Sequence, residues 1–320
     1  MKAPVDIIFP PVPPDRVPYW RRGLRGCSQL CFQSNELTGL FFLAALLIVS
    51  PIASAYFLVA AMLAPGARWL LGDRGAVLGT GMPGLNPCLI ALSLTGSFET
   101  GWTNFAMWGV LVACVAVTVV LTRLFLAVLP FPVLALPSVL TYWGLFALEP
   151  SLGFLEWRDL PSLADPEFEP VKLVLLNLAQ VLLSTDYWSG VLFLIGMYLS
   201  NWRHATVALL AAIIGTLASN CFYTMINPAS LTVTLMGFNA ILTAVAVYAT
   251  GGGKLSLAIL GTLVAIVMTS VFGLVDLPTL SAPYVLSTWI VLALVWIDTH
   301  CFTEPETAEP DVSTPAGTGN

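Results

Sequence analysis

The polar side chains inside the long uncharged stretches of this sequence are carboxamides and hydroxyls. Gln29 and Gln180 stand in two similar blocks, and Asn86 and Asn239 stand in a second pair of similar blocks. Acid–base catalysis needs a tuned His, Asp or Glu, and these stretches contain almost none. Carboxamides can instead donate and accept hydrogen bonds without changing charge. We therefore expect no enzymatic activity, and we expect these side chains to contact a neutral polar solute or to join packed helices.

The other residues with ligand chemistry do not form a recognisable site. The six cysteines are scattered without metal-type spacing. The glycine run before Lys254 lacks the context of a phosphate-binding loop and is expected to form a turn. The net charge of −6 argues against nucleic acid as a partner. We predict no metal, no cofactor and no nucleic-acid partner.

The elements that must position these residues are membrane-spanning helices. The chain is 58% hydrophobic and only 9% charged, whereas soluble domains carry roughly 25% charged residues. Several stretches without formal charge reach or exceed the roughly 20 residues of a spanning helix: 37–67, 75–98, 100–122, 205–253 and 255–275. The sequence predicts an all-α polytopic protein surrounded by membrane lipids.

Three blocks recur in the same order, which indicates a tandem duplication. QLCFQSN at 29–35 recurs as QVLLSTD at 180–186, GLNPCL at 84–89 as GFNAIL at 237–242, and LALPSVLTYW at 134–143 as LSAPYVLSTW at 280–289. The offsets are 151, 153 and 146 residues, so they nearly agree. We predict two related halves with a seam near 150–170.

Each half has about five predicted spans, and an odd number inverts the second half. In the first half the spans are expected at 39–50, 52–65, 82–95, 103–128 and 133–148. With the amino end inside, only Arg158 and Lys172 of the twelve basic residues fall outside. The other ten fall on the cytosolic side, as the positive-inside rule requires: Lys2, Arg16, Arg21, Arg22, Arg25, Arg68, Arg74, Arg123, Arg203 and Lys254. We predict inverted repeats in the plasma (inner) membrane with both termini cytoplasmic.

The predicted organisation has five parts: a cytosolic arm (1–25), the first repeat (26–150), an acidic extracytoplasmic linker (151–170), the inverted second repeat (171–301) and a disordered tail (302–320). Inverted repeats bind solutes where the copies meet near the midplane, often at broken, re-entrant helices. The prolines of 129–132 and 277–278, with Pro137 and Pro283 soon after, are candidates for those breaks.

The repeated blocks resemble those of the urea transporter family, in particular a bacterial member. The resemblance covers about residues 20–300. It rests on Gln29-Leu30-(x)4-Asn35-(x)2-Thr38-Gly39, on the two Gly-(aromatic or Leu)-Asn-(x)2-Leu blocks, and on LPTLSAPY at 277–284. The last block is similar to the family signature of Leu-Pro, two residues, Thr, one residue and Pro-Phe. The resemblance implies a homotrimer whose subunits each hold a central pore, which passes urea down its gradient through a narrow selectivity filter of oxygen ladders and apolar or aromatic slots.

Positions of this chain can be assigned to that filter by the resemblance. Gln29 and Gln180 take the place of the family's acid or amide. The wall and slot positions fall on Leu30, Val181, Phe32, Leu85, Leu89, Phe238 and Leu242, and Ser281 matches the signature threonine. Ala135 stands where the first half should carry its threonine, Ser138 where it should carry a Phe, and Leu85 replaces an aromatic residue. These departures predict a wider or less polar middle on that side.

Parts of the sequence also suggest other functions. The departures leave room for a channel for other small neutral solutes, such as short amides or water. Asn227-Pro228-Ala229 spells an aquaporin motif, but the duplication pairs Asn86 with Asn239, and ten spans exceed the six of an aquaporin. An ammonium channel would need paired pore histidines, whereas His204 and His300 are not repeat partners. A purely structural membrane scaffold is the remaining alternative.

Overall fold

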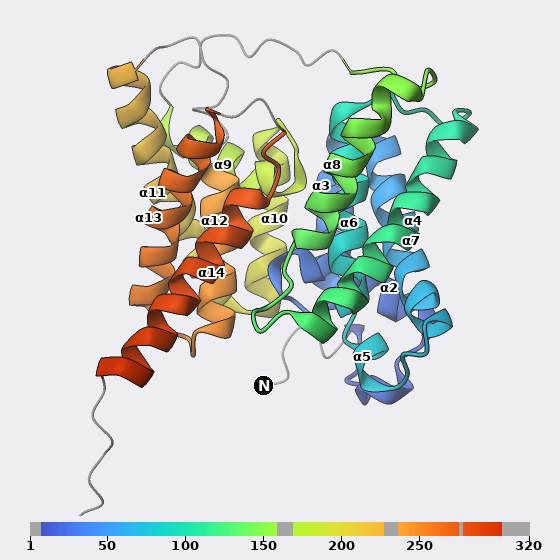
Figure 1. Ribbon diagram of the computed structural model, residues 1–320, viewed down its shortest axis with the longest axis horizontal. Helices are drawn as coiled ribbons and strands as arrows, with labels where there is room; N and C mark the ends of the chain where they lie inside the picture. Colours follow the sequence, from blue (N-terminus) through green and yellow to red (C-terminus); the bar gives the residue numbers. More distant parts are fainter. Residues whose placement is uncertain (1–7, 159–168, 227–235, 275–277, 303–320) are drawn as a thin grey trace, which may run out of the picture.

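The chain folds as a bundle of helices in two halves that lie side by side (Figure 1). The computed structural model describes residues 8–158, 169–226, 236–274 and 278–302. The first half contains α2 (Tyr19–Ser28), α3 (Glu36–Val49), α4 (Pro51–Leu70), α5 (Ala76–Gly79), α6 (Leu85–Ser97), α7 (Phe105–Val128) and α8 (Leu136–Leu148). The second half contains α9 (Pro170–Ala179), α10 (Tyr187–Ser200), α11 (Trp202–Ile226), α12 (Met236–Thr250), α13 (Leu255–Phe272) and α14 (Ala282–Ile297).

Short 3-10 turns and one π turn complete the described part of the chain. They are η1 (Pro14–Arg16), η2 (Gln29–Cys31), η3 (Met82–Gly84), η4 (Glu149–Ser151), η5 (Gln180–Leu182) and the π turn η7 (Asp298–Phe302). The glycine run 251–253 forms the expected turn between α12 and α13, where Gly252 and Gly253 have positive φ. The prediction of an all-α fold is confirmed.

Five described helices are long and apolar enough to cross a membrane: α4, α7, α11 up to Ser219, α13 and α14 extended to Phe302. Two bent pairs, α2–η2 with α3 and α9–η5 with α10, are apolar enough only when each pair is taken together. Both pairs bend by 74°, as in a broken span or a re-entrant loop. A break of this kind is tolerated in a membrane only where it faces protein or a solvated cavity. The predicted first-half spans overlap α3, α4, α6, α7 and α8, and α2 starts at Tyr19, inside the expected arm. However, α6 and α8 have 13 residues each, which is fewer than the roughly 20 residues that a spanning helix needs, so five separate spans in this half are not found among the described residues.

The two halves are related by a pseudo-twofold axis that runs between α3 and α10. Thr38 Oγ1 donates to the carbonyl of Gly196 at 2.8 Å, and Ser189 Oγ donates to the carbonyl of Ala45 at 2.7 Å. Each bond joins positions that are 151 residues from their counterparts, so the same contact is made twice with the halves exchanged. The start of each helix meets the later part of the other, so α3 and α10 are antiparallel. Reciprocal contacts of this type require a twofold relation.

The same exchange recurs where α8 and α14 meet between the halves. Trp143 Nε1 donates to the carbonyl of Pro278, and Trp289 Nε1 donates to the carbonyl of Pro132, both at 2.8 Å. Phe42 and Phe193, which are repeat partners, stack on each other with ring centroids 4.8 Å apart and planes 12° apart. Because the paired spans run antiparallel, the axis lies across the spans and the repeats are inverted, as predicted.

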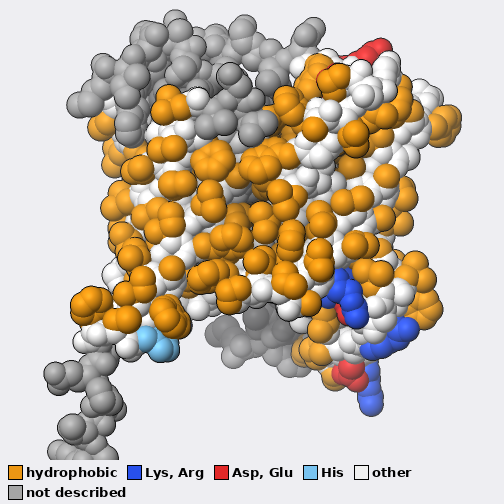
Figure 2. All heavy atoms as spheres, viewed as in Figure 1, with side chains coloured by type: hydrophobic (Ala, Val, Ile, Leu, Met, Phe, Trp, Pro, Cys, Tyr) orange, Lys and Arg blue, Asp and Glu red, His pale blue; other side chains and the backbone are white. Residues whose placement is uncertain are grey.

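The described charges gather mainly at one end of the bundle. Glu36 accepts hydrogen bonds from Arg21 and Arg25, and Asp73 is paired with Arg68 and Arg123. These residues, like Arg74, lie at the end where α3 begins, and Figure 2 shows Lys and Arg side chains only near that end, below a broad hydrophobic band. Lys172 and Arg158 lie at the opposite end, near the starts of α9 and α10 and the end of α6. This separation along the bundle agrees with the predicted distribution of basic residues.

Three expectations fall on residues that the structure does not describe. They are the aquaporin-like Asn227-Pro228-Ala229, residues 159–168 of the acidic linker, and residues 303–320 of the tail.

Candidate functional site

Four left-handed residues mark the breaks where the repeats meet. Phe32 and Leu183 follow η2 and η5 with φ of 57° and 51°, and Leu134 and Leu280 precede α8 and α14 with φ of 51° and 42°. They form two pairs of repeat partners. Among the described residues other than glycine, only these four have positive φ. A left-handed conformation costs on the order of 1–3 kcal/mol per residue, and such strained residues cluster at functional sites. Because the strain recurs in both repeats, it indicates that the functional site lies at the junction between them.

The repeat-related asparagines Asn86 and Asn239 hold the second break of each repeat. Asn86 donates through Nδ2 to the carbonyl of Leu134 at 2.9 Å and accepts from the backbone N–H of Ser138 at 3.1 Å. Asn239 does the same with Leu280 and Tyr284, at 3.2 and 3.3 Å. One carboxamide thus satisfies a carbonyl before the helix and an N–H in its first turn, where helices lack internal partners. Asn86 and Asn239 position the breaks.

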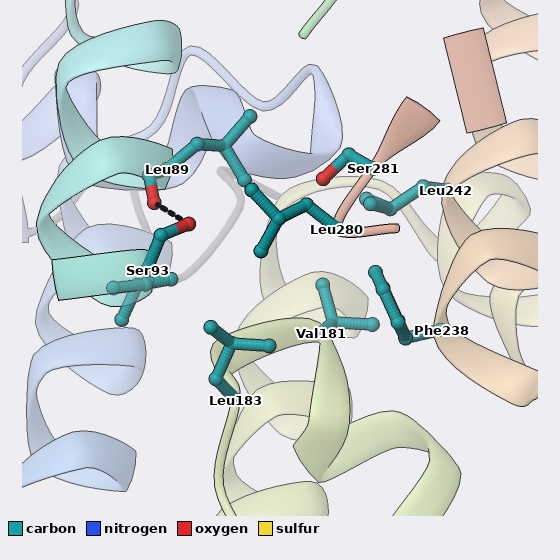
Figure 3. A pocket seen from close by; sticks show the side chains of 9 residues that line it. Leu89, Ser93, Val181, Leu183, Phe238, Leu242, Leu280 and Ser281 are labelled. Carbon is teal, nitrogen blue, oxygen red and sulfur yellow. Dashed lines mark hydrogen bonds between the residues drawn. The ribbon is translucent and has the colours of Figure 1, made fainter. Parts of the chain in front are cut away.

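A small cavity lies between the halves, beside these breaks (Figure 3). It is lined by Leu89, Leu92 and Ser93 from α6, Val181 and Leu183 from the η5 turn, Phe238 and Leu242 from α12, and Leu280 and Ser281 from the segment before α14. Its volume is about 20 Å³, little more than one water molecule requires. Its walls are apolar except for two serine hydroxyls, and none of the nine residues is ionisable.

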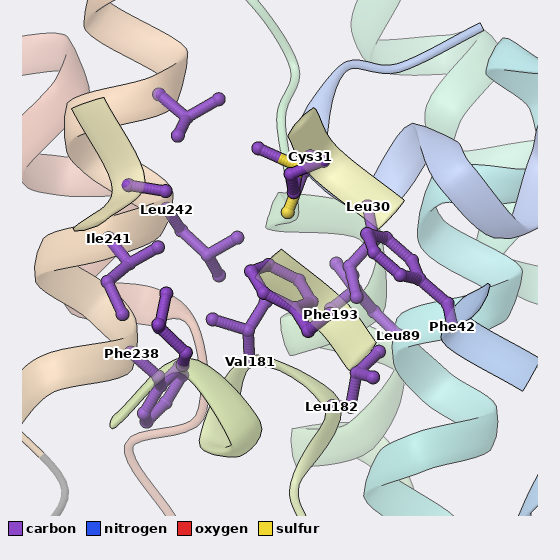
Figure 4. Close-up of a cluster of buried hydrophobic side chains, with 14 of the residues drawn as sticks. Leu30, Cys31, Phe42, Leu89, Val181, Leu182, Phe193, Phe238, Ile241 and Leu242 are labelled. Carbon is purple, nitrogen blue, oxygen red and sulfur yellow. The ribbon is translucent and has the colours of Figure 1, made fainter. Parts of the chain in front are cut away.

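Five of the eleven residues that the sequence assigned to a pore line this cavity: Leu89, Val181, Phe238, Leu242 and Ser281. Leu30, Leu85 and Ala135 are buried in the hydrophobic cluster that continues from it, and Phe32 packs against that cluster. Figure 4 shows Leu30, Leu89, Val181, Phe238 and Leu242 in one cluster around Phe193. The structure therefore collects these nine residues at one junction, although Leu30, Phe32, Leu85 and Ala135 do not line the cavity.

The two glutamines are buried beside this cluster in unequal surroundings. Gln29 is 4% exposed and donates through Nε2 to the carbonyl of Thr80 at 2.7 Å. Gln180 is 8% exposed, and its Oε1 has no hydrogen-bond donor among the described residues. A buried polar atom without a partner costs about 1–3 kcal/mol. Gln180 immediately precedes Val181 of the cavity wall, but Gln180 is not itself a lining residue.

Sequence reasoning missed four lining residues: Leu92, Ser93, Leu183 and Leu280. Two of them carried a signal, because Leu183 is the repeat partner of the predicted Phe32 and Leu280 directly precedes Ser281. Leu92 and Ser93 lie one helical turn beyond Leu89 on α6, outside the repeated block. Their positions on one helix face follow from the 3.6-residue period.

Comparison with known proteins adds independent evidence. The family described as "Urea transporter" matches residues 20–295. Urea transporter 1 of Rattus norvegicus is 24% identical over 310 residues, which covers 88% of this chain and 78% of that protein. Urea transporter 1 of Ovis aries is 25% identical over 309 residues with the same coverage of both chains.

The family match spans both bent pairs, both asparagine brackets and every residue of the cavity wall. The inverted repeat and the uncharged cavity at its centre are thus features of the matched region itself. The chain belongs to the urea transporter family.

Proposed function

We propose that this protein is a passive channel through which urea crosses a membrane down its gradient. The observation that carries the proposal is the cavity between the repeats, whose lining side chains are apolar apart from two hydroxyls and include no ionisable group. The mammalian relatives are named urea transporter 1. A wall without titratable groups offers no site for proton coupling, so transport is expected to need no energy source.

The chemistry of urea suits such a cavity. Urea is planar and neutral, with four N–H donors and one carbonyl acceptor. Removing it from water without new partners would cost several kcal/mol per polar group. Apolar side chains such as Phe238 and Leu242 match its flat faces, while the hydroxyls of Ser93 and Ser281 offer acceptors for its N–H groups. The buried Oε1 of Gln180, in the residue before Val181, is a further acceptor without a partner among the described residues.

The proposed path has two pseudo-symmetric halves. One half is lined by Gln180, Val181, Phe238 and Leu242, and the other by Gln29, Leu30, Phe32, Leu85 and Leu89, with Ser281 and Ala135 at the middle. The exchanged contacts Thr38–Gly196 and Ser189–Ala45 support this arrangement, because they relate one set to the other. We further propose that the protein is a homotrimer in the plasma membrane of a bacterium, in contact with lipids, and that its termini are cytoplasmic.

The main experiment is stopped-flow light scattering on proteoliposomes with outward gradients of urea. We expect urea to permeate at least tenfold faster than through protein-free vesicles, with no change on addition of a protonophore. Gln29→Leu with Gln180→Leu is expected to remove most of the urea flux. Asn104→Leu, which removes the carboxamide that caps α7 away from the cavity, is the matched control. Urea flux equal to that of empty vesicles would refute the proposal.

A second candidate is a channel for other small neutral solutes. It is favoured by Ala135, which supplies no hydroxyl at the position equivalent to Ser281. The same vesicles tested with acetamide, glycerol and water gradients separate the two candidates. Acetamide or water flux that exceeds urea flux would favour the second.

A further inference from the structure

Two arginines are paired with one carboxylate at the charged end of the first half, and a third arginine follows that carboxylate in the chain. Asp73 follows α4, and its two oxygens are paired with Arg68 of α4 and Arg123 of α7, the second at 2.6 Å. Arg74 is the next residue in the chain. Three guanidinium groups and one carboxylate leave a formal charge of +2 at this place, which we call the arginine cluster (Arg68, Asp73, Arg74 and Arg123).

Arg123 belongs to the lipid-facing side of its helix. Exposed residues recur along α7 at 112, 113, 116, 117, 120, 123, 124 and 127, at helical spacing, and apart from Arg123 they are apolar. Arg123 stands five residues before the end of α7 at Val128, roughly 7.5 Å along the helix axis. Its side chain is 48% exposed even with Asp73 as its partner. A cation on such a face reaches the membrane–water interface, where lipid headgroups lie.

Contacts hold one side of the Arg74 guanidinium group in place and leave its other side open. Its guanidinium lies over the ring of Trp69, with Cζ 4.7 Å from the ring centroid. Nη1 donates to the carbonyls of Trp69 at 2.5 Å and Asp73 at 2.8 Å. Among the described residues, Nε and Nη2 have no acceptor. These two nitrogens form the planar fork that binds two oxygens of a phosphate at once.

The surroundings are those of an interfacial site. Trp69 and Leu70 are 51% and 77% exposed, respectively, and tryptophan is enriched at the headgroup level of membranes. Val120 and Leu124 flank Arg123 on the exposed face of α7 and are also exposed. A headgroup at the arginines would place its acyl chains along this apolar face.

We propose that the arginine cluster binds the phosphodiester headgroup of an anionic phospholipid, with Arg74 and Arg123 as the residues that contact it. The excess of two positive charges favours a lipid without a compensating amine, such as phosphatidylglycerol or cardiolipin, over phosphatidylcholine. The site lies away from the pore cavity, so lipid binding and urea flux are separate properties of the protein.

The test is native mass spectrometry of the full-length protein in detergent, titrated with phosphatidylglycerol or phosphatidylcholine. We expect at least a tenfold preference of the wild-type protein for phosphatidylglycerol, and a preference that weakens as salt is raised. Arg74→Gln with Arg123→Gln should remove most of it. Arg203→Gln is the matched control. Arg203 also lies over an exposed tryptophan, with its Cζ 5.5 Å from the ring centroid of Trp202. In the described part of the chain, however, Arg203 has no neighbouring arginine that is paired with a carboxylate.

Each outcome of the lipid titration either supports the proposed lipid site or overturns it. Equal binding of the two lipids, or equal loss in the Arg203→Gln variant, would overturn the proposal. Inorganic phosphate that displaces phosphatidylglycerol at low millimolar concentration would assign the cluster to free phosphate instead. Size-exclusion chromatography and urea flux of the double variant, both expected to equal wild type, show that the variant is folded. A changed oligomer size would mean that the cluster joins subunits rather than lipid.

Discussion

Two serines supply the hydroxyl groups of the cavity wall, and both break the repeat symmetry. The repeat partners of Ser281 and Ser93 are Ala135 and Ala246. Ser93 Oγ donates its proton to the carbonyl of Leu89 at 3.0 Å, which leaves its lone pairs as acceptors. A solute with N–H groups can use them, and Figure 3 shows Ser93 turned toward Leu89 at the edge of the cavity.

Replacing Ser93 by alanine tests this role. Losing one acceptor of net value about 1 kcal/mol should lower urea permeability about fivefold, because 1.4 kcal/mol corresponds to a factor of ten. Water permeability should change less than twofold, and thermal stability should stay within about 0.5 kcal/mol. Stopped-flow measurements on matched vesicles check both. If urea flux is unaltered while protein content is equal, Ser93 is only part of the packing.

At the scale of elements, the helix breaks are held by hydrogen bonds that the two halves build alike. Asn86 and Asn239 each bracket a left-handed leucine, Leu134 or Leu280, and the first turn of the following helix. The proline-bearing segments that the sequence predicted as breaks fall at these places, since α7 ends at Val128 and α8 begins at Leu136. The sequence could find the breaks because proline removes a donor and fixes φ. It could not find the leucine conformation, since leucine has no preference for positive φ.

Asn86→Leu and Asn239→Leu should each destabilise the protein. Each change leaves a buried carbonyl and a buried N–H without their side-chain partner, at about 1–3 kcal/mol per group. Asn104→Leu removes a carboxamide only from the part-buried start of α7 and should cost about 1 kcal/mol. Thermal unfolding in detergent, followed by tryptophan fluorescence, ranks the three variants by their unfolding midpoints. Equal midpoints for the three variants would contradict the bracket role.

At the scale of the whole molecule, the halves are joined by contacts that occur in pairs. Phe42 and Phe193 meet each other directly across the pseudo-axis, while the tryptophan and hydroxyl contacts occur once in each direction. One contact departs from this symmetry: Gln33 Nε2 lies 2.8 Å from Nδ1 of His204, whose repeat partner is Ala53. This extra contact is at the end that carries most of the described positive charge.

The stacked phenylalanines should be energetically coupled. In a double-mutant cycle of Phe42→Leu and Phe193→Leu, we expect a coupling of about 0.5–1.5 kcal/mol in the free energy of unfolding, the value typical of an aromatic pair. The expected cost of either single change is larger than that of Phe302→Leu, an exposed control. Strict additivity would show that the halves do not depend on this contact.

The predicted orientation can be tested with two lysines at opposite ends. In a background where the exposed Cys221 and Cys301 are replaced by serine, Lys254→Cys should react with a membrane-impermeant maleimide only in opened cells. Lys172→Cys should react in intact cells, because the positive-inside rule places the more basic end in the cytosol. Labelling of both residues from the same side would contradict their placement at opposite ends of the bundle, and exchanged sides would reverse the orientation.

The sequence by itself determined that the protein lies in a membrane, that its chain is duplicated and that its apolar stretches carry uncharged polar groups. Hydropathy, the offsets between repeated blocks and the absence of ionisable residues from the apolar stretches are local properties of the chain. Only the tertiary structure decided which residues meet: Leu183, Leu280 and Ser93 in the cavity wall, and Arg123 with Asp73. These contacts depend on how helices that are far apart in the sequence cross, and on four strained backbone positions. Packing across the pseudo-twofold axis fixes both, and no stretch of sequence carries that information alone.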